Sequence, residues 1–357
     1  MAKQADTHLR TYVGTYTRGK SKGIYLLPID PATGAMGPPR LVAEMANPSF
    51  LAVDDSARCL YAVSEQKAGR VAAFAIDGKT GDLAPLNDQP SLGSHPCHVS
   101  VRPGGGLVLA ANYSSGSVCV LPVEADGRLG KPSDLVQHKG SSVNPRRQKG
   151  PHAHSVTPDA AGRLAYVADL GLDKVMIYRI DAAKGKLLPN DPPHAAAAAG
   201  AGPRHLAFSP AGRRAYLINE MGNKLTAFEC EPSGGLRETE TVPTLPAGFT
   251  GRSTTADVHV APSGRFVYGS NRGHDSIVVY AVDEATGRLT HTGHQHTGGR
   301  TPRNFAVDPS GRLLIAANQN GDNLVAFRLD PESGRPTPTG HVAEIPAPVC
   351  VRILPDG

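Results

Sequence analysis

This 357-residue sequence repeats a motif of about 19 residues, called the phrase below, and a small set of ionisable residues occupies equivalent positions in its copies. Some of them open the phrase, the others close it, and all could take part in chemistry. They are His154, Arg204 and Arg303 at the opening position and Glu65, Glu220 and Arg272 at the closing position. Arginines in a concave, partly dehydrated site bind carboxylate or phosphate through paired hydrogen bonds. A neighbouring histidine or glutamate can move a proton at neutral pH. The set predicts acid–base chemistry on a small anionic molecule.

The phrase predicts two strands joined by a tight turn. Residues 202–220 show it most clearly, with an apolar strand, a Ser-Pro-Ala-Gly-Arg turn and a second strand that ends in Asn219 and Glu220. Proline and glycine supply the backbone angles that such a turn requires. Ala57 takes the place of the turn glycine in one copy, and the other copies have Gly105, Gly162, Gly212, Gly264 and Gly311. A third strand follows each phrase, and a fourth usually follows an Asp-x-x-x-Gly turn. Units of about 50 residues with four strands are typical of β-propeller blades.

The two ends of the chain predict one more blade. Residues 9–16 and 23–30 would supply its second and third strands, and residues 348–353 would supply its first strand. Their pairing would close the ring and remove the exposed sheet edge that invites aggregation. We therefore predict an all-β fold, a single domain over residues 1–357. It is a seven-bladed β-propeller of four-stranded antiparallel blades, the last blade being closed by strands from both termini. The constant four-strand unit argues against a β-solenoid or a sandwich.

Antiparallel pairing predicts where the ionisable residues meet. The start of a first strand and the end of a second strand lie at the same end of a blade, opposite the turn. The opening and closing residues should therefore ring one mouth of the central channel. Several also have structural explanations: the recurring asparagines, Asn112 among them, are turn formers, and Arg204 with Glu220 could be a structural ion pair. Cys97 suits packing better than nucleophilic attack, and His205 is expected to pack against the next blade.

Charge and hydropathy argue against nucleic acid and membrane partners. The formal net charge of +5 is spread along the chain apart from a cluster at Arg146, Arg147 and Lys149, and no basic stripe carries aromatic residues. Residues 1–8 lack the apolar segment of a secretion signal. No stretch approaches the ~20 apolar residues of a membrane helix. These features predict a cytoplasmic protein that binds neither nucleic acid nor a membrane.

Cysteine and histidine spacing argue against disulfides, metals and cofactors. The five cysteines are odd in number and lack Cys-x-x-Cys spacing, which fits a reducing compartment. His291, His294 and His296 have a metal-like spacing, but they fall in a predicted outer strand or loop. No closed set of histidine and carboxylate ligands is evident elsewhere. We therefore expect no metal and no cofactor.

Short motifs along essentially the whole chain point to a family. They lie at residues 13–17 (Val-Gly-Thr-Tyr-Thr), 47–52, 142–148, 151–156 (Pro-His-Ala-His-Ser-Val), 168–174, 202–205 (Gly-Pro-Arg-His) and 219–220 (Asn-Glu). With these motifs the chain resembles the lactonase family of seven-bladed propellers. Known activities of that family are 6-phosphogluconolactonase and the fungal carboxy-cis,cis-muconate cyclase. The motifs are specific for the family and do not single out one substrate.

The resemblance also implies which residues act. The family's proposed site of one histidine, two arginines and one glutamate falls on His154, Arg204, Arg272 and Glu220. It further implies that Arg147 and His152, in the loop before His154, face the substrate. The turn after His154 departs from the other copies, because Pro158 is displaced by two residues. His152 therefore stays open as an alternative to His154.

Residues and resemblance together predict a lactone hydrolase acting on a small anionic lactone. The expected substrate is 6-phosphogluconolactone of the oxidative pentose phosphate route. Arg204, Arg272 and Arg303 would hold the phosphate and the oxyanion, while Glu220 or His154 would activate water. The expected substrate-binding residues are Arg303, Arg147, His152, Glu65 and Asn112. Two alternatives remain open: a cycloisomerase that forms or opens the lactone of a carboxylated muconate, and a non-catalytic binding scaffold.

Overall fold

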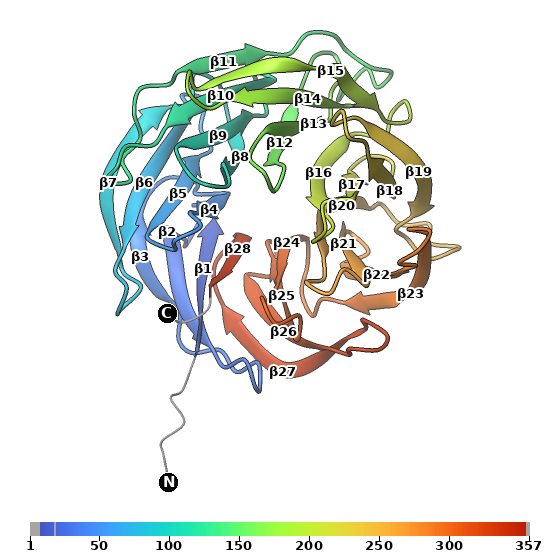
Figure 1. Ribbon diagram of the computed structural model, residues 1–357. Helices are drawn as coiled ribbons and strands as arrows, with labels where there is room; N and C mark the ends of the chain where they lie inside the picture. Colours follow the sequence, from blue (N-terminus) through green and yellow to red (C-terminus); the bar gives the residue numbers. More distant parts are fainter. Residues whose placement is uncertain (1–7, 18, 355–357) are drawn as a thin grey trace.

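Seven antiparallel sheets stand around a central channel (Figure 1). The computed structural model describes residues 8–17 and 19–354. All helices and strands assigned in these residues are β-strands, so the described fold is all-β. Each sheet has four strands. The predicted seven-bladed β-propeller is therefore confirmed. The described part of the chain contains no helix with the length and hydropathy to cross a bilayer. Residues 1–7, on which part of the localisation argument rested, lie outside the described residues.

The strands of each blade follow one another from the channel outward. The innermost strands, which line the channel, are β4 (Leu51–Val53), β8 (Pro96–Val101), β12 (Ala153–Pro158), β16 (Pro203–Phe208), β20 (Thr254–Val260), β24 (Pro302–Val307) and β28 (Pro348–Leu354). The second strands are β1 (Leu9–Thr15), β5 (Cys59–Ser64), β9 (Leu107–Asn112), β13 (Leu164–Asp169), β17 (Arg214–Asn219), β21 (Phe266–Arg272) and β25 (Leu313–Asn318).

The outer half of each blade has the same regularity. The third strands are β2 (Gly23–Ile29), β6 (Arg70–Ile76), β10 (Ser117–Pro122), β14 (Lys174–Asp181), β18 (Lys224–Cys230), β22 (Ser276–Val282) and β26 (Asn323–Leu329). The outermost strands are β3 (Arg40–Glu44), β7 (Leu83–Pro90), β11 (Asp134–Gln137), β15 (Lys186–Ala196), β19 (Leu236–Pro243), β23 (Leu289–His296) and β27 (Pro336–Glu344).

The ring closes where the two ends of the chain pair. Strand β28 is the innermost strand of the sheet that continues with β1, β2 and β3, and Val13 lies opposite Val351. Figure 1 accordingly shows the red strand β28 beside the blue strand β1. This confirms the predicted closure by strands from both termini. The free edges of the innermost strands face the channel of the closed ring, and β28 completes the blade that would otherwise begin with β1.

The hydrophobic core lies between neighbouring blades. In one such layer Leu109 and Val120 of one sheet pack with Val156 and Val167 of the next, and all four are fully buried. Each side chain of this kind contributes roughly 1.5–3 kcal/mol by leaving water. Because every sheet buries both faces against its neighbours, the second and third strands read as apolar runs. The blades are therefore held at fixed positions around the channel.

The predicted turns have the geometry that their residues favour. Gly162, Gly212, Gly264 and Gly311 all have positive φ, between 61° and 74°. Positive φ is costly for residues with a Cβ atom and free for glycine. These turns lie at the end of the channel opposite the closing residues of the phrase, as antiparallel pairing requires. The turns therefore set which residues reach each mouth.

Most innermost strands carry a β-bulge near their start, which the sequence count did not anticipate. In β16, Pro203 lies opposite Asn219 and His205 lies opposite Ile218, so Arg204 is an extra residue without a partner. The extra residues of four other blades are Cys97, His154, Arg303 and Val349. A bulge bends the strand and redirects the side chain of its extra residue. The opening residues of the phrase are therefore the residues that the bulges redirect.

Candidate active site

Glu220 gathers three guanidinium groups at one mouth of the channel. Its Oε1 lies 2.7 Å from Nη2 of Arg147, and its Oε2 lies 3.1 Å from Nε of Arg204 and 3.0 Å from Nη2 of Arg272. Glu220 follows β17, Arg204 opens β16, Arg272 ends β21, and Arg147 comes from the loop before β12. Ring closure therefore brings together residues that the sequence separates. The predicted pairing of Arg204 with Glu220 is part of this larger cluster.

The charges around Glu220 keep its carboxylate ionised. Burial by itself would raise its pKa, but Arg272, Arg204 and Arg147 lower the pKa to about 2. Burial, together with Arg272 and Arg303, lowers the pKa of Arg204 to about 9. Both groups are therefore charged at neutral pH. A carboxylate held this firmly by arginines is a weak base, and its main physical effect is to order the guanidinium groups.

His154 stands beside this cluster as a neutral imidazole. Its Nε2 lies 4.0 Å from Oε2 of Glu220, and its side chain is almost fully buried. Burial, reinforced by the charge of Arg204, lowers the pKa of His154 well below its usual value. The thiol of Cys97 donates to the carbonyl oxygen of His154 at 3.2 Å, and its sulfur lies 3.8 Å from Nδ1. Because Nδ1 faces the sulfur as an acceptor, Nδ1 carries the proton of the neutral ring. Nε2 is then the nitrogen that can accept a proton.

Arg303 and Glu65 meet through a tyrosine. The hydroxyl of Tyr16 donates to Oε2 of Glu65 at 2.8 Å and accepts from Nη2 of Arg303 at 3.0 Å. The Arg303 guanidinium also lies over the Tyr16 ring, 5.4 Å from its centroid. This second cluster meets the first at the channel floor. A small cavity of about 10 Å³ there, room for about one water molecule, is lined by Ser49, Phe50, Glu65, Cys97, Arg204, His205, Arg303 and Val349.

The rim of the mouth is formed by the loop between β11 and β12. Arg147 Nη2 donates to the hydroxyl of Tyr113 at 3.1 Å, and the Arg147 side chain is 41% exposed. His152 donates from Nδ1 to the carbonyl of Tyr113 at 3.0 Å and stacks on its ring. Gln148, which is fully buried, anchors the loop by donating to the carbonyl of Leu170 at 2.8 Å. His152 therefore lies at the rim, whereas His154 lies deeper beside Glu220.

The structure does not bring Asn112 to this site. Its side chain is fully buried and donates to the carbonyl of Ser91 and the hydroxyl of Ser117. Asn271 makes the equivalent bonds to Thr244 and Ser276 in its own blade. These asparagines tie the end of a second strand to neighbouring loops, a structural role that the turn-former interpretation anticipated. Successive side chains of a strand point to opposite sides, so only the residue after each asparagine can face the mouth.

That following position supplies two contacts absent from the predicted set. Tyr16 and Tyr113 stand one residue beyond Thr15 and Asn112, as Glu220 stands one beyond Asn219. The signal in the sequence was the alternation of side chains along the second strand, applied to the tyrosines as well as to the charged residues. Both tyrosines hold a site arginine through their hydroxyl groups.

A buried hydrogen-bond chain fixes Arg204 from behind. Arg204 Nη1 donates to Nε2 of His205 at 3.2 Å, and His205 Nδ1 donates to Oδ1 of Asp257 at 2.7 Å. Arg204 also donates to the carbonyl of Ala256. Burial and the charge of Arg204 lower the pKa of His205 to about 4, so its ring is neutral and can accept from Arg204. His205 packs against the next blade, as expected, and at the same time orients a site arginine.

The described residues do not form a metal-binding cluster. His291, His294 and His296 lie on the outermost strand β23, as the sequence predicted, with His291 Nε2 3.1 Å from His294 Nδ1. Within residues 8–17 and 19–354, no three side chains of His, Cys, Asp or Glu stand close enough to share a metal ion.

Known proteins share this architecture. The family described as "Lactonase, 7-bladed beta-propeller" matches residues 10–353. A 6-phosphogluconolactonase of Bacillus subtilis is 40% identical over 280 residues, 78% of this chain and 79% of that protein. A 6-phosphogluconolactonase of Formosa agariphila is 32% identical over 301 residues, 81% of this chain and 83% of that protein.

A solved structure agrees with the sequence relatives. The periplasmic gluconolactonase of Pseudomonas aeruginosa is 37% identical and superposes with a TM-score of 0.93, covering 97% of this chain and 99% of that one. The predicted resemblance and the predicted enzyme class, a lactone hydrolase, are confirmed by these matches. The chain belongs to the lactonase family of seven-bladed β-propellers.

Proposed function

We propose that this protein hydrolyses 6-phosphogluconolactone to 6-phosphogluconate at the mouth that holds Glu220. The observation that carries the proposal is the charge of the site. Four guanidinium groups share the mouth with two carboxylates, and the excess of two positive charges matches a phosphate monoester, which carries nearly two negative charges at neutral pH. The arginines are Arg147, Arg204, Arg272 and Arg303, and the carboxylates are Glu65 and Glu220. Relatives named 6-phosphogluconolactonase support the same substrate.

The arginines lie at different depths, and in the proposal those at the rim and those deeper in the mouth bind different parts of the substrate. Arg147 is the exposed one, with 41% of its side chain accessible, whereas Arg272 is 13% and Arg204 is 2% accessible. In the proposal, the phosphate lies at the rim against Arg147 and His152. The lactone ring lies deeper, where Arg204 and Arg272 donate to the carbonyl oxygen. A preorganised donor aimed at a developing oxyanion contributes roughly 3 kcal/mol to lowering the barrier.

His154 serves as the base in this proposal, and Glu220 as its charged neighbour. Glu220 has a pKa of about 2, so it takes a proton from water poorly. His154 is neutral, and its Nε2 faces Oε2 of Glu220 at 4.0 Å. Bound substrate would offset part of the arginine charge that lowers the pKa of His154 and thereby make its ring more basic. The imidazolium formed during the reaction would be stabilised by Glu220.

The proposed reaction balances without a further reactant. Water attacks the lactone carbonyl carbon and gives a proton to His154 Nε2, while Arg204 and Arg272 hold the oxyanion. The tetrahedral intermediate then breaks the bond between the carbonyl carbon and the ring oxygen. That oxygen takes the proton back from His154. The products are a hydroxyl group and a carboxylic acid, which releases its own proton to solvent water to become the carboxylate. The site returns to its starting protonation state.

A substrate panel tests the proposal. The protein is assayed with 6-phosphogluconolactone, with unphosphorylated gluconolactone and with a carboxylated muconolactone, each corrected for spontaneous hydrolysis. We expect the phosphorylated lactone to have the highest kcat/KM, because only it engages Arg147 fully. Preference for the muconolactone would replace the proposal with the cycloisomerase alternative. Rates at background for all three would leave the site as a binding scaffold.

A further inference from the structure

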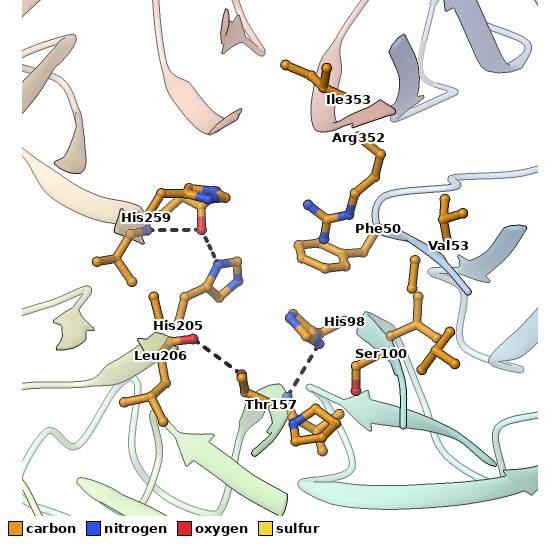
Figure 2. Close-up of a pocket in the computed structure, with 18 of the residues that line it drawn as sticks. Phe50, Val53, His98, Ser100, Thr157, His205, Leu206, His259, Arg352 and Ile353 are labelled. Atoms are coloured by element: carbon orange, nitrogen blue, oxygen red, sulfur yellow. Dashed lines mark hydrogen bonds and ion pairs between the residues drawn. The ribbon is translucent and has the colours of Figure 1, made fainter. Parts of the chain in front are cut away.

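We propose that the opposite end of the channel is a second binding site, specific for a small carboxylate with an apolar body. A cavity of about 410 Å³ lies there, between the inner strands of six blades (Figure 2). Phe50 and His205 line this cavity and also the small cavity under the candidate active site. They therefore stand between the two ends of the channel. The proposal does not depend on the proposed lactonase activity.

An unpaired cation faces this cavity. Arg352 of β28 is partly buried, and its guanidinium lies over the Phe50 ring, 4.6 Å from the centroid. Its Nε donates to the carbonyl of Leu51 at 2.7 Å, and its Nη1 donates to the carbonyl of Val351 at 3.3 Å. Among the described residues, no carboxylate forms an ion pair with Arg352, and its Nη2 donates no hydrogen bond. Cations removed from water are normally paired, so the arrangement calls for an anion.

A second donor lies beside the first. Nδ1 of His98 accepts the backbone N–H of Val156 at 3.4 Å, which leaves the proton of the neutral ring on Nε2. Burial lowers the pKa of His98 well below its usual value, so the ring is neutral at physiological pH. No described residue accepts from Nε2. The His98 and Phe50 ring centroids are 4.1 Å apart, and Figure 2 shows Phe50 between His98 and Arg352.

Asp257, the one carboxylate among the described residues that line the cavity, is already satisfied. Oxygens of Asp257 accept from His205 at 2.7 Å, from His259 at 3.0 Å and from the backbone of Val258 at 3.0 Å, and also from the Asn304 amide. Figure 2 shows His205 and His259 on the far side of the cavity from Arg352. Asp257 therefore does not neutralise Arg352. The charged and titratable groups that line the cavity are Arg352, Asp257, His98, His205 and His259.

The remaining walls decide the chemical class of the ligand. They combine partly exposed apolar side chains with the hydroxyl-bearing Ser100 and Thr157, and the apolar ones include Val53, Val101, Ile353 and Leu354. In the proposal, one carboxylate oxygen accepts from Arg352 Nη2, the other is directed past the edge of the Phe50 ring towards His98 Nε2, and an apolar body covers the apolar side chains. An inorganic phosphate would leave these walls wet and two of its oxygens without donors. The cavity therefore favours a monocarboxylate with a short aliphatic or aromatic body.

Calorimetric titration with benzoate tests the site. We expect saturable binding to the full-length protein, with benzamide and inorganic phosphate binding about tenfold or more weakly, the effect of losing one charge-assisted hydrogen bond. The candidate active site also attracts anions, so the titration is repeated on Arg272→Gln. Benzoate affinity retained there, and reduced about tenfold or more in Arg352→Gln, assigns the binding to the far end of the channel. Absence of binding to the unmodified protein overturns the proposal, as does loss confined to Arg272→Gln.

A second variant guards against misfolding. Arg352 also bonds two backbone carbonyls, so Arg352→Gln could disturb β28, which near-UV circular dichroism would reveal. His98→Phe keeps a ring packed on Phe50 and removes the Nε2 donor, together with the long Nδ1 contact to the backbone N–H of Val156. We expect this variant to weaken benzoate about tenfold while retaining the spectrum of the unmodified protein. Unchanged benzoate affinity in a folded His98→Phe variant contradicts the proposed site.

Discussion

Oε1 of Glu220 lies 2.7 Å from Nη2 of Arg147, although 73 residues separate them in the chain. The same carboxylate binds Arg204 and Arg272 through its other oxygen. Glu220 thus joins the rim of the mouth to its floor. Because three like charges converge on it, removing its charge leaves the guanidinium groups to repel one another. Stability and activity should both depend on this one side chain.

Glu220→Gln should lower stability in a way that depends on pH. The pKa of Glu220 in the folded protein is about 2, below its ordinary value of 4.5, so ionisation stabilises the fold. That contribution, on the order of 3 kcal/mol, is complete above about pH 4.5 and is lost as the pH falls towards 2. Urea unfolding at about pH 7, 5 and 3 should show the difference between variant and unmodified protein shrinking at the lowest pH. A difference that is the same at all three would contradict this assignment.

Arg272→Ala should remove a donor to the oxyanion. Arg272 is 13% exposed and held by Glu220 at 3.0 Å and by the carbonyl of Thr255 at 2.8 Å, so its guanidinium is preorganised. We expect kcat/KM to fall by about 10²–10³ on both phosphorylated and unphosphorylated gluconolactone. Arg300→Ala, which removes an exposed arginine, is the matched control and should retain the full rate. An unchanged kcat/KM in Arg272→Ala would remove this arginine from the mechanism.

Arg147→Ala should change the preference between substrates more than it changes the rate of the chemical step. In the proposed function Arg147 contacts the phosphate at the rim. Its loss should raise KM for 6-phosphogluconolactone by about tenfold or more, the effect of one charge-assisted hydrogen bond. KM for unphosphorylated gluconolactone should change little. The neighbouring exposed Arg146 provides the control variant, Arg146→Ala. Equal losses on both lactones would show that Arg147 acts through Glu220 and not on the phosphate.

His154→Gln should remove the acid limb of the pH profile. Burial holds the pKa of His154 well below its ordinary value of 6.5, so the free enzyme keeps a neutral base down to mildly acidic pH. We expect kcat/KM of the unmodified protein to stay level through pH 6.5 and to fall only in more acidic solution. The variant should lose about 10²–10⁴ in kcat with little change in KM. Parallel profiles of His152→Gln decide between the two histidines, since a rim residue should affect KM instead.

Asp257→Asn should disturb Arg204 from a distance. Asp257 accepts from His205 Nδ1, which leaves His205 Nε2 free to accept from Arg204. Asparagine can present its amide N–H₂ to His205, reverse the tautomer and turn Nε2 into a donor that faces a donor. We expect kcat to fall about tenfold, the effect of one misdirected hydrogen bond. His259→Gln, on the other side of Asp257, serves as the control. A purely structural role would lower thermal stability and leave kcat of the folded fraction unchanged.

Side-chain alternation explains which site residues could be read from the sequence. Glu220 and Arg272 were found because their phrases end at the position that faces the mouth. Asn112 stands one position earlier, and its side chain points to the opposite side and into the blade. Applying the same alternation to every blade would have replaced Asn112 with Tyr113. The alternation of side chains along a strand therefore predicts the site residues better than residue type alone.

The β-bulges could not be predicted from the sequence. Counting back from the turn glycine reached Arg204 and His154, but ordinary pairing would place them in register with a partner residue. The structure makes each of them an extra residue, redirected by the bend of its strand. Nothing local to Pro203 or Ala153 signals this, because a bulge depends on how the whole strand pairs. Which atoms meet, and at what distance, follows from that pairing.

Local sequence patterns were sufficient to predict the seven-bladed ring and most of the charged residues at its mouth. Both depend on local patterns: turn glycines at regular intervals, alternating strands and motifs typical of the family. The three-dimensional arrangement was needed to show that Glu220 binds three arginines, that His205 and Asp257 support Arg204, and that Arg352 pairs with no carboxylate of residues 8–17 and 19–354. These relationships join blades far apart in the chain. Their energies depend on distance and burial, quantities that arise only when the ring closes.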